Sequence, residues 1–390
     1  MISVAEARAR IVAAMVLQPT QTIALETAAG RVLAQDHCAA HDQPPFPVSA
    51  MDGYAVRSAD SGPRHVIGTA PAGHPYPGTV GAGEAVRIFT GGVVPDGADA
   101  IVIQEDVTVD GDRITFDIAP LPGRFVRQRG LDFAAGEMLV PAGRRLTAFD
   151  LALLAAGNAE QIRVRRKPRI AFAATGDELT RPGEPRKPGG ITASGNAGLA
   201  AMIADWGGEP LDLFILPDRA DAIATLADVK ADLIVTIGGA SVGDHDLIQS
   251  ALGANGFVAN FWKIAMRPGK PLIFGRINDT PLLGLPGNPV SALVTALLFA
   301  RPAMAAMLGL PTQLQTQGAR LAAALPANDG REDYLRATRI LRDDEVFVQA
   351  APLQDSSMLK TLARADCLIV RAPHAPAAAE GETVETIALA

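Results

Sequence analysis

Residues 232–246 read DLIVTIGGASVGDHD, and this stretch decides the fold. Its first part, 233–237, is a short apolar run rich in β-branched residues, which is typical of a strand buried on both faces. A glycine-rich turn follows at 238–243, and a helical pattern covers 246–252. An apolar strand that runs through a glycine turn into a helix predicts one unit of a parallel sheet covered by helices.

The same alternation extends over residues 168–318. Three more apolar runs alternate with helical patterns, the runs at 169–173, 211–216 and 281–285 and the helices at 197–206, 218–227 and 290–300. They predict a doubly wound parallel sheet, in which ligands bind beyond the carboxyl ends of the strands. We therefore expect the functional site in the four turns that follow the strands.

The rest of the chain differs from this α/β region. Residues 45–140 hold short alternating runs separated by Gly and Pro, which predicts a β-rich domain, and Asp110-Gly111 indicates a hairpin within it. Residues 319–390 return to short strands, and 1–44 with 141–167 form a helical and extended linker domain. The predicted fold class is therefore multidomain α/β.

Composition excludes several classes of protein. A net charge of −7 argues against a general nucleic-acid surface, and 48% hydrophobic with 20% charged residues argues against a mainly disordered chain. Cys38 and Cys367 lie far apart and outside any metal-ligand spacing, which excludes a disulfide framework and fits a reducing cytosol.

Two apolar segments could be taken for a signal peptide or a membrane span. Ser3 and Glu6 form a capping box, which predicts a helix start in place of a signal peptide. Arg301-Pro302 interrupts the apolar stretch 291–310 before it reaches the length of a span. We expect a soluble, cytoplasmic protein without a membrane segment.

The four strand-end turns carry glycine, hydroxyl, amide and acidic residues. They are Thr175, Gly176, Asp177 and Glu178 after the first strand, Asp218 after the second, Gly238, Gly239, Ser241, Gly243, Asp244 and Asp246 after the third, and Pro286, Gly287 and Asn288 after the fourth. Glycines let backbone amides approach an anion, and carboxylates near a phosphate commonly hold Mg²⁺. Taken singly, each is equally a tight turn or, at Asp218 and Asp246, a helix N-cap. Their repetition at four strand ends favours a site.

A cationic segment, 261–271, offers a second anion site. Lys263, Arg267 and Lys270 lie close together in an otherwise acidic chain, although a solvated loop explains them equally from charge alone. In the β-rich domain, Asp52 and Thr90 lie in polar loops. From the residues alone, we expect a Mg²⁺-assisted site for a phosphorylated, nucleotide-bearing ligand together with a second anion.

Six stretches together resemble the molybdopterin molybdenumtransferase family, which comprises the bacterial MoeA proteins and the E domain of gephyrin. They are SAMDGYAVR (49–57), RIFTG (87–91), ATGDEL (174–179), GGASVGDHD (238–246), FWKIAMRPGKP (261–271) and GLPGNPVS (284–291). The resemblance covers nearly the whole chain. It implies a molybdopterin-binding α/β domain, a β-rich lid, and the last step of molybdenum cofactor synthesis: molybdenum insertion into adenylylated molybdopterin with release of AMP, aided by a divalent cation.

The resemblance also implies roles for residues. The Gly238–Gly243 and Pro286–Asn288 turns would hold the pterin phosphate or the adenylate, and Asp218, Asp244 and Asp246 would hold Mg²⁺ on the pyrophosphate. Molybdate would bind Lys263, Arg267 and Lys270, with Arg336 and Ser356 from the C-terminal domain. Catalysis would involve Glu178, Asp218 and Asp246, with Asp52, Thr90, Arg127 and Asp132 supplied by the partner chain of an elongated homodimer.

Three positions depart from the family pattern. Leu131 stands where an acid is common, Ala193-Ser194-Gly195 replaces an Asp-Ser-Asn segment with Asn196 shifted beside it, and Arg267 replaces a common Lys. Two alternatives stay open at this point: the related molybdopterin adenylyltransferase, which is also a possible partner, and a gephyrin-like scaffold.

Overall fold

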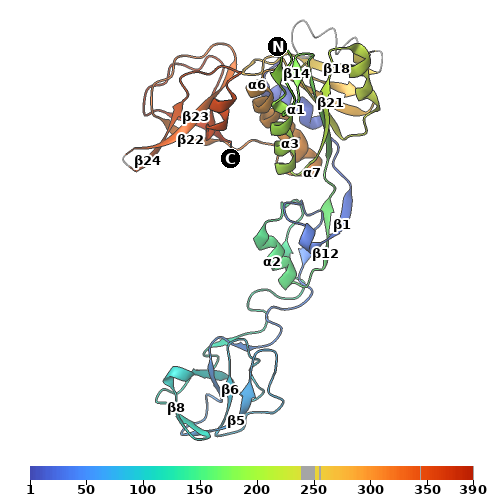
Figure 1. Ribbon diagram of the computed structural model, residues 1–390. Helices are drawn as coiled ribbons and strands as arrows, with labels where there is room; N and C mark the ends of the chain where they lie inside the picture. The colour runs from blue at the N-terminus through green and yellow to red at the C-terminus, as the bar shows by residue number, and fades with distance from the viewer. Residues whose placement is uncertain (239–250, 254–255, 343, 390) are drawn as a thin grey trace. The chain divides into compact units, whose positions relative to one another are not determined.

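The computed structural model describes residues 1–238, 251–253, 256–342 and 344–389. The chain divides into two compact units, one made of Met1–Gln21 with Arg165–Ala390 and the other of Thr22–Val164. Figure 1 colours both units along the chain, and each is described here by itself.

The first unit is built on a six-stranded sheet in the order β16-β13-β17-β21-β20-β18. Its strands are β13 (Arg169–Thr175), β16 (Glu209–Leu216), β17 (Leu233–Ile237), β18 (Phe257–Trp262), β20 (Ile273–Ile277) and β21 (Thr280–Leu285). The four strands predicted from apolar runs are parallel to one another, and β20 and β18 extend the sheet in antiparallel register. The prediction of a parallel sheet is confirmed.

Helices and apolar side chains cover both faces of this sheet, as the near-continuous apolar strands require. One face packs against α1 (Val4–Ala13), α3 (Gly195–Asp205), α6 (Pro289–Thr295) and α7 (Arg301–Leu308), and the other against α4 (Ala220–Ala224) and the 3₁₀ turn η3 (Thr225–Asp228). The sheet is therefore doubly wound, with its core on both sides.

One prediction about a helix end is wrong. Arg301-Pro302 does not end the apolar helix: a π-helical turn at Ala296–Ala300 joins α6 to α7, so Pro302 lies inside a continuous helix, where it has no N–H to donate to the preceding turn. The N-cap role, which was the alternative to a site role for Asp218, is not the one observed, because Arg219 occupies the N-cap position of α4.

The joined helix Pro289–Leu308 is long and apolar enough, by length and composition alone, to cross a membrane. It is a core helix of the sheet, since 78% of its apolar window is buried inside the protein. Helix α1 packs beside it, where the Arg8 guanidinium donates to the Leu298 carbonyl at 3.2 Å. The Ser3 hydroxyl caps α1 as predicted, whereas Glu6 pairs with Arg10.

The C-terminal part of this unit is a small closed sheet. Strands β22 (Gln317–Leu321), β23 (Glu332–Arg342), β24 (Glu345–Ala350), β25 (Cys367–Arg371) and β26 (Thr383–Ala388) close through the β23–β25 pairing into a barrel-like domain. A short strand of the α/β region, β19 (Met266–Arg267), adds in parallel to β23, and α8 (Leu359–Ala363) contacts α6.

The second unit is rich in short strands. Its main sheet has the order β7-β4-β6-β5-β9-β8, formed by β4 (Gly53–Val56), β5 (Arg64–Ala70), β6 (Glu84–Ile88), β7 (Ala100–Ile103), β8 (Thr108–Asp110) and β9 (Arg113–Thr115). The predicted hairpin joins β8 to β9 through Gly111, whose φ of +60° suits glycine.

Smaller pieces complete the second unit. Helix α2 (Ala148–Ala156) begins at a capping box of Thr147 and Asp150. Around it and the main sheet lie β2 (His37–Cys38), β3 (Val48–Ser49), β10 (Val126–Arg127), β11 (Met138–Val140) and the 3₁₀ turns η1 (Leu25–Thr27) and η2 (Gln104–Asp106). Strands β1 (Thr20–Ala24) and β12 (Gln161–Arg165), most of whose residues belong to this unit, pair as a two-stranded sheet.

Candidate functional site

The ends of β13, β17 and β21 meet at one edge of the sheet. The Gly238 N–H donates to the Leu285 carbonyl at 3.0 Å. A Cβ on Gly238 would lie 2.8 Å from the Thr175 carbonyl oxygen and 2.9 Å from its hydroxyl, so only glycine fits there, at a φ of +97°. A Cβ on Gly287 would lie 3.6 Å from the Gly238 Cα. Three of the predicted turns are therefore neighbours.

The turn after β13 brings in the fourth strand end. The Asp218 N–H donates to the Asp177 carboxylate at 3.2 Å, which joins the end of β16 to the end of β13. Gly176 has a φ of +152°, and a Cβ there would lie 2.5 Å from the Glu178 carboxylate. The buried Thr175 hydroxyl has no hydrogen-bond partner among the described residues, which leaves a polar group unsatisfied at this edge.

Five predicted residues of the third turn, Gly239, Ser241, Gly243, Asp244 and Asp246, lie outside the described residues. Within the part of the chain that the structure describes, no three His, Cys, Asp or Glu side chains form a cluster that could hold a metal ion. Asp177 and Asp218 contribute two carboxylates at the shared edge, and oxygen ligands of this kind are those that Mg²⁺ prefers.

The fourth turn differs from the prediction in how Asn288 is used. Asn288 occupies the N-cap position of α6, but its side chain caps nothing and its Nδ2 donates to the Ser356 hydroxyl at 3.0 Å. The Ser356 carbonyl in turn accepts the Val290 N–H at 3.1 Å. The C-terminal domain therefore supplies the cap and brings Ser356 to the end of β21.

Arg336 is buried beside this contact, with 1% of its surface exposed. Its Nη2 donates to the Asp355 carbonyl at 3.1 Å, and its Nε has no partner among the described residues. Burial is the larger effect on the guanidinium and lowers the pKa of Arg336, although among the described residues the Asp355 carboxylate attracts its charge. A buried cation with donors to spare is the arrangement that an oxyanion would complete.

The cationic segment is not a cradle of three equivalent cations. The Arg267 Nε donates to the buried Asp333 carboxylate at 2.7 Å, and Asp329 lies 3.7 Å from its Nη1. Hydrogen bonding to Asp333 raises the pKa of Arg267, so its charge is already neutralised within the protein. Lys263 and Lys270 lie on one loop, which is closed by N–H bonds from Lys263 to the Leu272 carbonyl and from Ile264 to the Lys270 carbonyl.

In the second unit, the Asp52 carboxylate accepts the Thr90 N–H at 2.7 Å and its hydroxyl at 2.8 Å, and these bonds hold the pKa of Asp52 below its usual range. Arg127 and Asp132 line a hollow of about 470 Å³ with Leu131 and Gly91, the neighbour of Thr90. The four predicted residues of this domain therefore fall into two pairs, Asp52 with Thr90 and Arg127 with Asp132, and Gly91 lies next to both.

Sequence reasoning missed two contacts. Asp333 is a buried residue of β23. An acidic residue among the buried positions of a strand needs a partner, and this was the sequence signal that could have indicated the pair with Arg267. The Asn196 amide donates to Asp212 at 2.8 Å and to the Phe214 carbonyl at 3.1 Å, so Asn196 has a structural role. No sequence pattern indicated this second contact.

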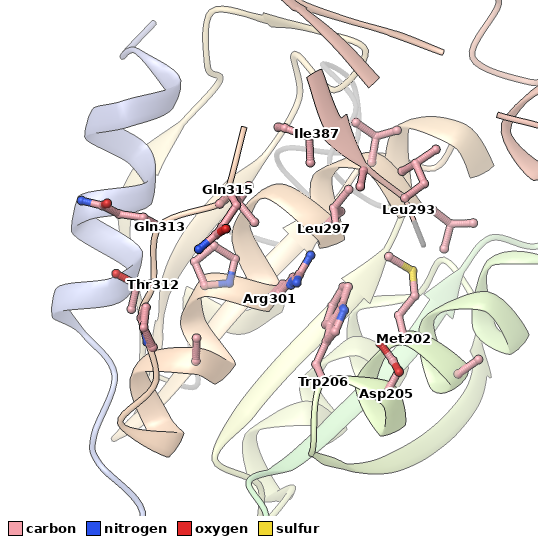
Figure 2. Close-up of a pocket in the computed structure, with 18 of the residues that line it drawn as sticks. Met202, Asp205, Trp206, Leu293, Leu297, Arg301, Thr312, Gln313, Gln315 and Ile387 are labelled. Atoms are coloured by element: carbon pink, nitrogen blue, oxygen red, sulfur yellow. The ribbon is translucent and has the colours of Figure 1, made fainter. Parts of the chain in front are cut away.

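A pocket of about 600 Å³ in the first unit lies elsewhere. Figure 2 shows Met202 from α3 and Trp206, the residue that follows α3, facing Arg301 and Leu297 across it. Since α3 leaves the carboxyl edge at Gly195, its last residues lie toward the opposite edge, where Gly208 approaches the Pro168 carbonyl. This pocket is therefore separate from the strand-end residues.

Comparison with known families divides the chain into three matches. Residues 2–157 match the MoeA N-terminal region (domain I and II), residues 171–306 a probable molybdopterin binding domain, and residues 318–389 the MoeA C-terminal region (domain IV).

Relatives match over most of the chain. A molybdopterin molybdenumtransferase of Haemophilus influenzae is 35% identical over 94% of this chain and 93% of its own length, and one of Nostoc is 35% identical over 90% and 85%. Among solved structures, a molybdopterin biosynthesis MoeA protein of Pyrococcus horikoshii covers 100% of this chain and 99% of its own, with a TM-score of 0.84 and 30% identity. This chain therefore belongs to the molybdopterin molybdenumtransferase family.

Proposed function

We propose that this protein is a transferase that inserts molybdenum, taken as molybdate, into adenylylated molybdopterin and releases AMP, the last step of molybdenum cofactor synthesis. The observation that carries the proposal is one hydrogen bond, from Asn288 Nδ2 to the Ser356 hydroxyl. It joins the strand-end turns of the α/β domain to the segment of the C-terminal domain that contacts the buried guanidinium of Arg336. A phosphate-type edge and an oxyanion-type cation are thus adjacent.

The substrate's phosphates fit the strand-end turns. Gly238 and Gly287 leave room for a ligand close to the backbone, and the unsatisfied Thr175 hydroxyl offers a hydrogen bond. Pro286 orders the same turn, and Gly239, Ser241 and Gly243 follow Gly238 in the sequence. We assign Glu178 to the reacting edge because its carboxylate lies against Gly176.

Asp218 would hold Mg²⁺ together with Asp244 and Asp246, and Asp177 shares the edge with Asp218. Bound there, the ion would withdraw negative charge from the pyrophosphate as AMP leaves. The glycine turns at the strand ends would position the phosphates whether or not the ion is bound, because they contribute backbone N–H donors and room for the ligand.

Molybdate would bind Arg336 and Ser356, with Lys263 and Lys270 attracting the dianion from the neighbouring loop. Arg267 is left out of this set because Asp333 neutralises it. Tungstate is a tetrahedral oxyanion of the same charge, so the site selects by shape and charge for this class of anion.

A second copy of the chain would complete the site. Asp52, Thr90, Arg127 and Asp132 lie in the second unit, and we propose that a cytoplasmic homodimer brings them to the partner's strand ends. If the site is shared, a mixed dimer of an Asp52→Asn chain and an Asp218→Asn chain has one intact site. Random exchange makes about half of the dimers mixed, so we expect an average of about half of one active site per dimer. Two inactive chains that stay inactive after exchange would contradict a shared site.

The alternatives are not favoured. An adenylyltransferase reading would leave the second unit and the C-terminal domain without a role, whereas the family matches span both. A pure scaffold would not need the unsatisfied Thr175 hydroxyl or Arg336. We propose that the adenylyltransferase is instead a partner that supplies its product to this protein.

The test supplies purified protein with adenylylated molybdopterin, Mg²⁺ and molybdate, and measures AMP release and active cofactor. We expect both, dependent on molybdate. Consumption of ATP with free molybdopterin, or cofactor formation unaffected by Asp218→Asn, would contradict the proposal.

A further inference from the structure

Phe214 in β16 has a backbone conformation that aromatic residues rarely adopt. Its φ is +67°, in the left-handed region that favours glycine, and 47% of the residue's surface is exposed. The pairing of β16 with β13 shifts register here, between Phe172 and Ala174. Phe214 is therefore part of a bulge on the edge strand, two residues before the carboxyl end of that strand at Leu216.

Three hydrogen bonds hold this bulge. The Asp212 carboxylate accepts the Phe214 N–H at 2.8 Å and the Asn196 amide at 2.8 Å, and the Asn196 amide also donates to the Phe214 carbonyl at 3.1 Å. Asn196 is buried and lies in the first turn of α3, and its Oδ1 has no partner among the described residues. The fold thus fixes Phe214 in a strained state that glycine would occupy without strain.

An arginine stacks on the exposed ring. The Arg181 guanidinium carbon lies 3.8 Å from the centroid of the Phe214 ring. Arg181 follows β14 (Leu179–Thr180), which continues from Glu178 in the turn after β13, and its own N–H is held by Glu184 at 3.1 Å. Both members of the pair are exposed and come from segments that end at the substrate edge.

We propose that Arg181 and Phe214 form a stacking platform for a planar heteroaromatic ring of the substrate, its pterin or its adenine. This inference rests on the proposed function and names residues that position the substrate beyond the strand-end turns. A guanidinium already stacked on an aromatic ring presents a flat cationic face, on which a heteroaromatic ring stacks while the charge attracts its phosphates. Without a ligand to bind, a strained and exposed aromatic residue would only lower the stability of the fold.

The test measures dissociation constants of the full-length protein for two probes, AMP and a 6-substituted free pterin, by calorimetry. Phe214→Gly and Arg181→Ala should each weaken the probe that stacks by about tenfold. Arg181→Lys should weaken it nearly as much, because lysine keeps the charge without the plane. Phe214→Leu is compared with the control variant Phe149→Leu. Phe149 is an exposed phenylalanine of α2 in the other unit, so its substitution should leave both dissociation constants unchanged.

Phe214→Gly also separates binding from folding. Because glycine suits a φ of +67°, its Tm should equal or exceed that of the unaltered protein while binding weakens. Loss confined to AMP assigns the platform to adenine, and loss confined to the pterin assigns it to the pterin ring. Unchanged constants for both probes in Phe214→Gly and Arg181→Lys would overturn the inference alone, whereas an unaltered protein that binds neither probe would overturn the proposed function with it.

Discussion

Arg267 and Arg336 lie on neighbouring strands of the C-terminal sheet, β19 and β23, in opposite surroundings. Arg267 is half exposed and bonds the buried Asp333 with Asp329 close by, which raises its pKa. Arg336 is buried, contacts only a carbonyl through its guanidinium among the described residues, and has its pKa lowered by burial.

The difference teaches that the number of cations in a segment does not measure its capacity to bind an anion. A guanidinium that is paired with a carboxylate is already neutralised within the protein, whereas one that donates to a carbonyl keeps donors for a ligand. Arg267 links the α/β region to the C-terminal domain, and Arg336 is the stronger candidate for molybdate.

The largest effect should come from Arg336→Ala. We expect turnover at low molybdate to fall by about 100-fold, ~2.8 kcal/mol, because a charge-assisted pair of hydrogen bonds is lost. Arg336→Lys should recover part of the activity, since it restores charge without the planar fork. The measurement is AMP release against molybdate concentration.

Arg339→Ala is the control, because Arg339 lies on the same strand with an exposed side chain. Its molybdate dependence should match the unaltered protein. Equal losses in the two variants would show that the strand needs positive charge in general and that burial at Arg336 is irrelevant.

Arg267→Met should do the reverse. It leaves Asp333, whose side chain is 6% exposed, charged and without its partner, at a cost to the free energy of unfolding of about 1–3 kcal/mol. Molybdate dependence should stay within about twofold, less than ~0.4 kcal/mol. Urea denaturation and AMP release check the two parts.

The matched control is Arg331→Met, which removes the exposed pair with Asp329 and should cost less stability than Arg267→Met. A stable Arg267→Met protein that no longer responds to molybdate would return Arg267 to the anion site and abolish the contrast with Arg336.

Much of the fold was predictable because its signals are local. The runs that became β13, β16, β17 and β21 are apolar over consecutive residues, and burial on both faces of a sheet needs no information from elsewhere in the chain. The glycine at 238 was equally readable as a turn after a strand.

The surroundings of the cations were not predictable, because they depend on distant residues. Asp333 lies 66 residues after Arg267, and Ser356 lies 68 residues after Asn288, so no spacing rule joins them. Phe214 likewise adopts its conformation through Asn196, which precedes it in another element. Charge and cap patterns identify capable residues, and tertiary contacts decide which remain available.

Ser356→Ala tests the contact that joins the two domains next to Arg336. Losing the hydroxyl that accepts from Asn288 should raise the molybdate requirement by about threefold, ~0.6 kcal/mol, because that contact is partly exposed to water. Ser357→Ala, whose hydroxyl donates to Asp355 instead, should leave the requirement unchanged. Similar shifts in both variants would indicate a general effect on the segment.

Asp329→Asn gives the smallest effect and a pH signature. Arg331 and, more weakly, Arg267 lower the pKa of Asp329 from 3.8 to about 2. A carboxyl whose folded pKa is depressed stabilises the protein above its unfolded pKa and stops doing so as the pH falls through the folded value. Urea midpoints of the variant should therefore lie slightly below those of the unaltered protein at pH 7 and converge with them between about pH 4 and pH 2. Asp117→Asn, at an exposed aspartate of the other unit, is the control. A gap as large at pH 2 as at pH 7 would mean that Asp329 acts through its shape and that its charge does not contribute to the contact with Arg267.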